Sequence, residues 1–292
     1  MNRRQLLQLA VPAAGASPAA TTPLVVRHAL FQQQSSKVLA YELQVLELLL
    51  EKTVASHGPY RLEAAGLVSQ NRAFLQLRDG DVDLLSSMSS REREQNGLPL
   101  RVCLYRGLLG VRLPIALAAR QDTLEKVSNL AEARALRLAQ VSDWPDTRVF
   151  ADNAWPIEHL PKLALFPEML RRQRIDLFAL GALEVYPIVD AWPDLVVLNQ
   201  WLIAYPSAYY FFVSPKRPEL AQRLQVGWSR VLADGSFQAL FERGPGTLLK
   251  RARLQERRWL LLRNPQLPEQ TPLQDSRLWH PLVHQRLLQN QG

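Results

Sequence analysis

The chain has 292 residues, of which 47% are hydrophobic and 21% are charged, which is typical of a globular protein with room for two cores. Lysine and arginine number 35 and aspartate and glutamate 27, so the formal charge is +8. The arginines are spread along the chain without an RNA- or DNA-binding motif, which argues against nucleic-acid binding. The one cysteine, Cys103, allows no internal disulfide, and its apolar surroundings predict a buried side chain.

Residues 1–20 have the pattern of a secretory signal peptide. Arg3 and Arg4 precede a short Leu, Ala and Val core, which is followed by small residues. The arginine pair also resembles a twin-arginine export signal, although Asn2 replaces the usual Ser or Thr. Pro12 interrupts the apolar core, so a membrane span is not expected. The pattern favours export over the alternative, a disordered cytosolic tail.

The residues after this signal alternate between strand and helix patterns. Leucines recur at spacings of four, three and four from Leu39 to Leu50, which predicts an amphipathic helix packed on a sheet. Short apolar runs on either side predict strands. The predicted strands are residues 24–30, 60–68 and 82–86, and the predicted helices are residues 36–56 and 71–78.

The middle of the chain repeats this alternation. Pro167 can open one of its helices, because the first helical position needs no N–H donor. The predicted strands are residues 112–119, 136–141, 175–179 and 195–198, and the predicted helices are residues 124–135 and 167–173. Strands that alternate with helices in this way argue for the α/β class with mostly parallel sheets.

Residues 205–244 carry the clearest local signals. Their run YYFFV is aromatic and β-branched, as expected of a buried strand. Pro218 suits the first position of a helix. Asp234 and Gly235 mark the end of that helix, and Ser236 is expected to cap a second one. The segment therefore predicts a strand, a turn, a helix, a stop and a short second helix.

The tail, residues 246–292, is basic and rich in proline. Residues 247–264 match a basic amphipathic helix, with leucines, Ala252 and Trp259 on its inner face. A helix that lies on a membrane surface would share this pattern. The interrupted apolar face favours instead a terminal helix docked on the first α/β unit. The prolines that break regular structure beyond it are Pro265, Pro268 and Pro272.

An ordered series of short motifs runs through the second unit. A Trp-Pro-Asp triplet begins at Trp144, the sequence LFPEML begins at Leu165, and RIDLF begins at Arg174. Together with the elements of residues 205–244, this series resembles the bacterial extracellular solute-binding proteins of family 3, over residues 24–270. That family has the type 2 periplasmic-binding fold.

The resemblance implies an α/β architecture of two lobes, the Venus-flytrap arrangement. Each lobe would be a mixed, mostly parallel sheet flanked by helices, and two connecting strands near residues 104–110 and 202–209 would form the hinge. Lobe 1 would comprise residues 24–106 and 205–245, lobe 2 residues 107–204, and the tail, residues 246–292, would pack on lobe 1.

The candidate site follows from the general rule that open α/β sheets bind ligands at the carboxyl ends of their strands. Residues 86–93 resemble the family segment whose arginine grips a ligand carboxylate, and either Arg91 or Arg93 matches. A guanidinium group holds a carboxylate through two parallel hydrogen bonds. The alternative is that both are surface arginines paired with Glu92 or Glu94. The predicted ligand-binding residues are Phe31, Gln34, Ser86, Ser87, Ser89, Arg91, Arg93, Trp144, Asp146 and Glu184.

The second lobe departs from the family pattern. Amino-acid binders have an aspartate there that takes the ligand's ammonium group, but residues 179–184 read ALGALE, in which only Glu184 can substitute. The arginine often found near Leu180 is also missing. Because a buried unpaired ammonium is costly, a less polar ligand or little binding activity stays open beside an amino acid. Trp144 would stack on a flat ligand or only cover the second core.

The resemblance implies a periplasmic protein that captures a small polar solute, an amino acid or related carboxylate, for the membrane permease of an ABC transporter. It implies no catalysis, cofactor or metal, and a monomer. His280 and His284 suit a metal by spacing but lack a third ligand. Two alternatives remain: an enzyme similar to cyclohexadienyl dehydratase, with Glu184 as general acid, and a periplasmic sensor or accessory protein.

Overall fold

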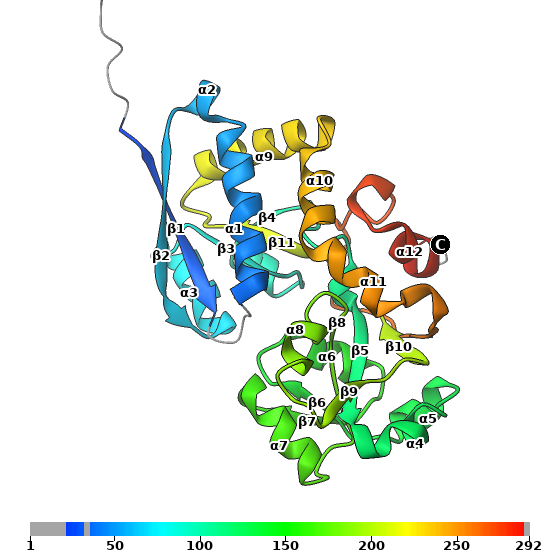
Figure 1. Cartoon of the computed structure of the whole chain (residues 1–292). Coiled ribbons are helices and arrows are strands. Elements are labelled where there is room, and N and C mark those ends of the chain that lie inside the picture. Colours follow the sequence, from blue (N-terminus) through cyan, green and yellow to red (C-terminus); the bar gives the residue numbers. More distant parts are fainter. Residues whose placement is uncertain (1–21, 32–35, 289–292) are drawn as a thin grey trace, which may run out of the picture.

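The computed structural model describes residues 22–31 and 36–288, and of residues 30, 31 and 36–39 it describes the backbone alone. Two sheets with helices against them form two lobes, one above the other in Figure 1. The mixed α/β class predicted from the alternating patterns is therefore confirmed.

The first lobe is built on a sheet with the strand order β2-β1-β3-β11-β4. β1 is parallel to β2 and β3, whereas β11 is antiparallel to both of its neighbours. The strands are β1 (Leu24–Phe31), β2 (Tyr60–Val68), β3 (Leu84–Met88), β4 (Leu98–Leu100) and β11 (Tyr209–Val213). The helices are α1 (Ser36–Glu51), α2 (Val54–His57), α3 (Gln70–Asp79), α9 (Pro218–Ala233) and α10 (Ser236–Arg243).

β11 shows that the chain returns to the first lobe after building the second. It lies between β3 and β4, with Tyr209 opposite Met88 and Val213 opposite Leu84. All its residues from Tyr210 to Val213 are buried, which explains the aromatic and β-branched run. The predicted order of strand, turn and helix is confirmed here, with Pro218 in the first turn of α9.

The second lobe is built on a seven-stranded sheet with the order β12-β10-β5-β8-β6-β7, in which β9 also pairs with β5. The strands are β5 (Val111–Leu117), β6 (Leu138–Val141), β7 (Ile157–Leu160), β8 (Leu177–Gly181), β9 (Leu195–Val197), β10 (Trp201–Ala204) and β12 (Arg258–Leu261). The α-helices are α4 (Gln121–Leu124), α5 (Leu130–Arg134), α6 (Pro145–Asp152), α7 (Phe166–Arg171) and α8 (Val185–Val189).

Two segments, residues 101–110 and 205–208, connect these sheets, and they lie against each other. The N–H of Tyr205 donates to the Gly110 carbonyl at 3.1 Å. A Cβ atom on Gly110 would come within 2.3 Å of the Tyr205 carbonyl oxygen, so only glycine allows this approach. This close contact holds the two connecting segments against each other where they join the second sheet.

Two local predictions are wrong. The helix expected over residues 124–135 is wrong: α4 already ends at Leu124, and a separate short helix, α5, begins at Leu130. The Asn129 side chain accepts a hydrogen bond from the Glu132 N–H and caps α5. Ser236 does not cap α10. Gly235, in the left-handed region at φ 74°, is the capping residue, and Asp234 accepts from the Ser236 N–H at 2.9 Å.

The tail also differs from its prediction. Residues 247–264 form short helical turns (η5, Pro245–Leu248; α11, Leu249–Ala252; η6, Leu254–Glu256) and then β12. Arg253 takes a left-handed conformation at φ 47°, which ends α11. β12 pairs in parallel with β10 of the second sheet, so this part of the tail does not pack on the first lobe alone. The backbone hydrogen bonds that residues 258–261 form with β10 are more favourable than the helix that their amphipathic pattern predicts.

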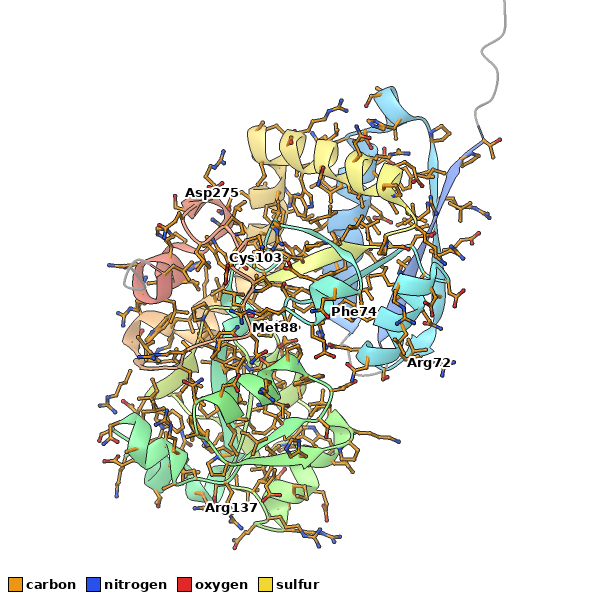
Figure 2. All side chains as sticks on the ribbon, turned by 180° about the vertical axis from the view of Figure 1, so that it is seen from behind. Arg72, Phe74, Met88, Cys103, Arg137 and Asp275 are labelled. Atoms are coloured by element: carbon orange, nitrogen blue, oxygen red, sulfur yellow. The ribbon has the colours of Figure 1, made fainter. Side chains whose placement is uncertain are left out.

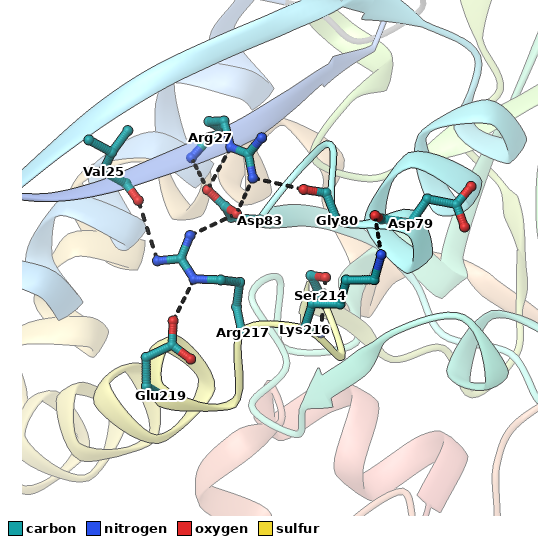
Figure 3. Close-up of polar contacts among 9 residues, drawn as sticks. All are labelled: Val25, Arg27, Asp79, Gly80, Asp83, Ser214, Lys216, Arg217 and Glu219. Carbon is teal, nitrogen blue, oxygen red and sulfur yellow. Dashed lines mark hydrogen bonds and ion pairs between the residues drawn. The ribbon is translucent and has the colours of Figure 1, made fainter.

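Each lobe carries a buried aspartate just before a central strand. Figure 3 shows Asp83, which precedes β3, accepting from the backbone and guanidinium of Arg27 at 2.8 Å and pairing with Arg217 at 2.8 Å. In the second lobe Asp176, which precedes β8, accepts from the Arg137 backbone at 2.9 Å and pairs with Arg120. Burial raises the pKa of each carboxyl, but the arginines outweigh it and lower the pKa of Asp176 to about 2. Asp176 of the RIDLF motif thus has a structural role, in ion pairs with Arg120 and Arg137 from outside the motif.

Candidate functional site

The two lobes meet where the carboxyl ends of β3, β6 and β8 face each other. Figure 2 places Met88, the last residue of β3, at the level where the lobes join, with Phe74 of α3 on the same side of the first lobe. Two buried arginines lie here: Arg93, 6% exposed, from the first lobe and Arg112, 3% exposed, from the second.

Arg93 begins a short 3-10 turn after β3, where the Ser90 hydroxyl accepts from its N–H at 3.2 Å. Its guanidinium donates to the Ser87 hydroxyl, to the Met88 carbonyl at 3.3 Å, and across the cleft to the Asp143 carbonyl at 3.1 Å. It also lies 5.1 Å from the Phe74 ring centroid.

These partners of Arg93 are neutral. Within residues 22–31 and 36–288, no carboxylate forms an ion pair with it. Burial lowers the pKa of Arg93 to about 10, because desolvation penalises the charged form. The site therefore holds a desolvated cation, and among the described residues no carboxylate lies within ion-pair distance of it.

Arg91 and Arg93 have different environments. The Arg91 side chain is exposed, and its backbone N–H donates to the Gln266 carbonyl of the tail at 3.0 Å. Of the two arginines that the sequence left open, the fold brings Arg93 into the cleft and leaves Arg91 on the surface.

The hydroxyl groups of three serines at the end of β3 form hydrogen bonds with different partners. Ser86 donates to Glu42 of α1, whose other carboxylate oxygen accepts from the Tyr105 hydroxyl at 2.9 Å. Ser87 accepts from Arg93. Ser89 is buried and donates to Glu94 at 2.6 Å, so its hydroxyl belongs to an internal network. Of these three hydroxyl groups, the structure brings that of Ser87 to Arg93, whereas those of Ser86 and Ser89 bond to Glu42 and Glu94.

Two further predicted residues, Phe31 and Gln34, come at and just after the last residue of β1 in the sequence. Phe31 is the last residue of that strand, at the carboxyl edge of the sheet as expected, and its side chain is outside the described residues. Gln34 also lies outside the described residues.

Arg112 of β5 has charged neighbours, in contrast to Arg93. Its guanidinium lies 3.3 Å from Asp146 and 3.9 Å from Glu184, and it donates to the Ala179 carbonyl at 2.9 Å. Burial lowers the pKa of Arg112, but the carboxylates of Asp146 and Glu184 outweigh it and raise the pKa above its ordinary value. The positive charge of Arg112 is therefore satisfied within the protein.

Asp146 and Trp144 open helix α6. Trp144 occupies the capping position and is half-buried, 5.9 Å from the Arg112 guanidinium. Asp146, in the first turn, pairs with Arg112 and accepts from the Tyr205 hydroxyl. Asp146 thus belongs to a buried internal network, and Trp144 is the more accessible of the two.

Glu184 is the most accessible carboxylate of this group, with 24% of its side chain exposed. It accepts from the Gly181 N–H at 3.2 Å, and burial raises its pKa even though Arg112 opposes the shift. A carboxylate at the end of β8 that is only partly neutralised can accept a hydrogen bond from a cationic or amide group.

A cavity of about 560 Å³ opens between the lobes beside Arg93. Both lobes and the tail contribute to it, with Phe74 and Arg93 on one side, Trp144 and His159 on the other, and Gln266 at its rim. An aromatic ring on each side, with a cation beside Phe74, suits a small molecule that has an anionic group and an apolar body.

Sequence reasoning missed several residues of this junction. The signals were present: Arg112 interrupts the buried strand VRLPIAL, and Glu42 interrupts the leucine-rich helix α1. A charge inside an apolar pattern predicts either a buried ion pair or a site, because an uncompensated buried charge is unfavourable. Tyr105, Tyr205 and Gln266 had no such signal, since their roles depend on which segments meet.

The described ranges contain neither a cluster of metal ligands nor a membrane-spanning helix. No three His, Cys, Asp or Glu side chains gather there closely enough to hold a metal ion. None of the helices in those ranges combines the length and the apolar character that crossing a bilayer requires.

Comparison with known proteins gives the fold. No protein-family profile and no curated protein sequence matches the chain. Among solved structures, an arginine-specific periplasmic binding protein of Salmonella typhimurium matches with a TM-score of 0.59 at 11% identity, over 76% of this chain and 99% of that one. A putative L-cystine ABC transporter protein of Listeria monocytogenes matches with 0.55 at 13%, over 76% and 96%.

A histidine kinase sensor domain with similarity to periplasmic binding proteins matches with a TM-score of 0.55 at 16% identity, over 77% of this chain and 96% of that one. At such identities the likeness shows the fold. The chain therefore has the two-lobed periplasmic-binding fold that its sequence pattern resembles. About a quarter of it lies outside the match to each of these proteins.

Proposed function

We propose that the protein binds a small solute with a carboxylate group in the cleft between its lobes. The observation that carries this proposal is Arg93: a buried guanidinium at the end of β3, beside a cavity, with neutral partners only among the described residues. A ligand carboxylate would supply the missing charge through two parallel hydrogen bonds. Ser87 orients the guanidinium from behind.

The second lobe would complete the contacts. Trp144 supports a flat or apolar part of the ligand from its half-buried position at the cavity wall. Glu184 does not line the cavity, but Asp146 is already bound by Arg112 and Tyr205, so contact with an amino or amide group of the ligand would fall to Glu184 on closure of the lobes. Contact of one ligand with both lobes stabilises the closed state, which is the mechanism by which two-lobed binding proteins signal occupancy.

The cellular role we propose is delivery of this solute to a membrane permease of an ABC transporter in the periplasm, by a monomer exported through its N-terminal signal. Two of the fold's solved relatives are named as an arginine-binding protein and an L-cystine transporter protein, which supports an amino acid or related carboxylate as ligand. No catalysis, cofactor, metal or nucleic acid enters this proposal.

A thermal-shift screen with amino acids and small carboxylates tests the proposal. A ligand at one hundred times its dissociation constant should stabilise the protein by about 2.7 kcal/mol, which is a clear rise in melting temperature. Arg93→Gln should abolish that rise, whereas the matched variant Arg91→Gln, two residues away and exposed, should retain it. A screen in which no compound shifts the wild type, or an Arg93→Gln variant that still responds fully, would refute carboxylate capture.

Two alternatives have a specific observation in their favour. The raised pKa of Glu184 favours a general acid, as an enzyme on this scaffold would need. Turnover of prephenate that is lost in Glu184→Gln would establish such an enzyme. The likeness to a kinase sensor domain favours a sensor instead, and a ligand response in a strain without the permease would separate sensing from transport.

A further inference from the structure

The tail crosses between the lobes a third time, in addition to the two connecting segments. Its strand β12 belongs to the second sheet, and the N–H of Leu262 continues the pairing by donating to the Ala204 carbonyl at 2.8 Å. The chain then passes to the first lobe: Figure 2 places Asp275 at the side of the upper lobe and Arg137 at the bottom of the lower one. We call residues 262–280 the strap.

The strap is fastened first to the second lobe. Asn153 at the end of α6 and Arg263 exchange two hydrogen bonds, at 2.7 and 3.0 Å. The Asn264 side chain donates to the Pro206 carbonyl of a connecting segment at 2.8 Å. These bonds hold the start of the strap against α6 and against the hinge.

Gln266 then bridges the two lobes. Its carbonyl accepts from the Arg91 N–H of the first lobe at 3.0 Å, and its side chain donates to Asp152 of the second lobe at 2.6 Å. The same residue lines the cavity that contains Arg93 and Trp144. A single residue of the tail therefore touches both sides of the cleft at its rim.

The far end of the strap is fixed near the first lobe. Arg106 donates to the Trp279 carbonyl at 3.0 Å and accepts from the His280 N–H at 2.9 Å, while its guanidinium lies over the Phe241 ring of α10. Trp279 is fully buried against Gly107, whose φ of 80° and missing side chain allow the contact. The strap thus has its two ends on different lobes.

We propose that the strap limits opening of the cleft and that Gln266 provides the restraint, because it bonds to both lobes. The strap is too long to restrain the lobes by length alone, since an extended chain of its size spans roughly 60 Å. The restraint therefore lies in its contacts, and its prolines at 265, 268 and 272 narrow the conformations available once a contact breaks. The bond to Arg91 uses the Gln266 backbone carbonyl and the bond to Asp152 uses its side chain, so opening the cleft must break one of these two bonds.

Distance measurements between spin labels test the strap in the full-length protein without any ligand. The labels go on Arg72→Cys of the first lobe and Lys162→Cys of the second, both exposed, in a Cys103→Ala background. Gln266→Ala keeps the backbone bond to Arg91 but loses the side-chain bond to Asp152, so opening no longer breaks a bond at this residue. The ratio of open to closed molecules should rise about fivefold, as expected for loss of one hydrogen bond near the surface. Asn153→Ala, which releases the strap from α6, should act in the same direction.

The matched control is Gln285→Ala, an exposed glutamine of the same tail that lies beyond the strap. It should leave the distance distribution of the wild type unchanged. Identical distributions in the wild type, Gln266→Ala and Asn153→Ala would overturn the strap. Because the measurement uses no ligand, that result would not bear on carboxylate capture, and a failed ligand screen would not bear on the strap.

Discussion

Arg93 and Arg112 are both buried at the junction of the lobes, yet their environments are opposite. Arg112 has two carboxylates within 4 Å, and their charge raises its pKa. Arg93 has neutral partners among the described residues, and burial lowers its pKa to about 10. Burial of a cation therefore does not by itself identify its role. The role follows from whether the protein itself supplies the opposite charge.

The largest expected effect on stability comes from replacing Arg112. Arg112→Met should destabilise the protein by about 3–5 kcal/mol, because Asp146 and Glu184 would then share a buried site without a cation. Urea unfolding at neutral pH measures this loss. Adding Asp146→Asn should recover part of the stability. If the double variant is no more stable than Arg112→Met, the charge argument for this pair is wrong.

Arg93→Met should change the stability far less. The lowered pKa corresponds to a burial cost of about 3 kcal/mol for the charged group. Three hydrogen bonds of about 1 kcal/mol each offset that cost, so the net change should stay within about 1 kcal/mol. The same urea experiment measures it. If Arg93→Met loses as much unfolding free energy as Arg112→Met, then Arg93 has a structural role and the two arginines do not differ in the way proposed.

The smallest expected effect concerns Glu184. Its raised pKa means that the folded protein favours the protonated form, so the stabilisation is present below the ordinary pKa of 4.5 and is lost as pH rises through the raised value. Glu184→Gln should remove this pH dependence and change stability at pH 7 by less than about 1 kcal/mol, since the side chain is partly exposed. Melting curves from pH 4 to pH 8 measure it. A pH profile identical to that of the wild type would contradict the assignment.

The order of elements could be predicted because local rules govern it. Strand β2 matches its prediction at both ends, β1 and β11 lie where apolar runs indicate, and α9 begins at Pro218. Each signal depends on side-chain periodicity, proline geometry or a glycine stop, which act within a few residues. The lobe boundaries in the sequence remain predictions, as does the signal peptide.

The tail shows where local rules fail. Residues 258–261 have helical neighbours and a basic amphipathic pattern, yet they form β12, because β10 of the second sheet offers a free edge for pairing. That edge is created by residues 57 positions earlier, as in the pair Trp201 and Arg258, so no local window contains the information. The same holds for Gln266, which touches both lobes only after they have folded.

The sequence by itself determined the α/β class, the return of the chain to its first sheet, and a serine-rich strand end followed by two arginines. Only the tertiary structure decided that Arg93 lies in the cleft while Arg91 is exposed, and that Arg112 is neutralised by Asp146 and Glu184. The physical reason is that the electrostatic role of a side chain depends on which distant segments bring opposite charge to it. That arrangement exists only once both lobes have assembled.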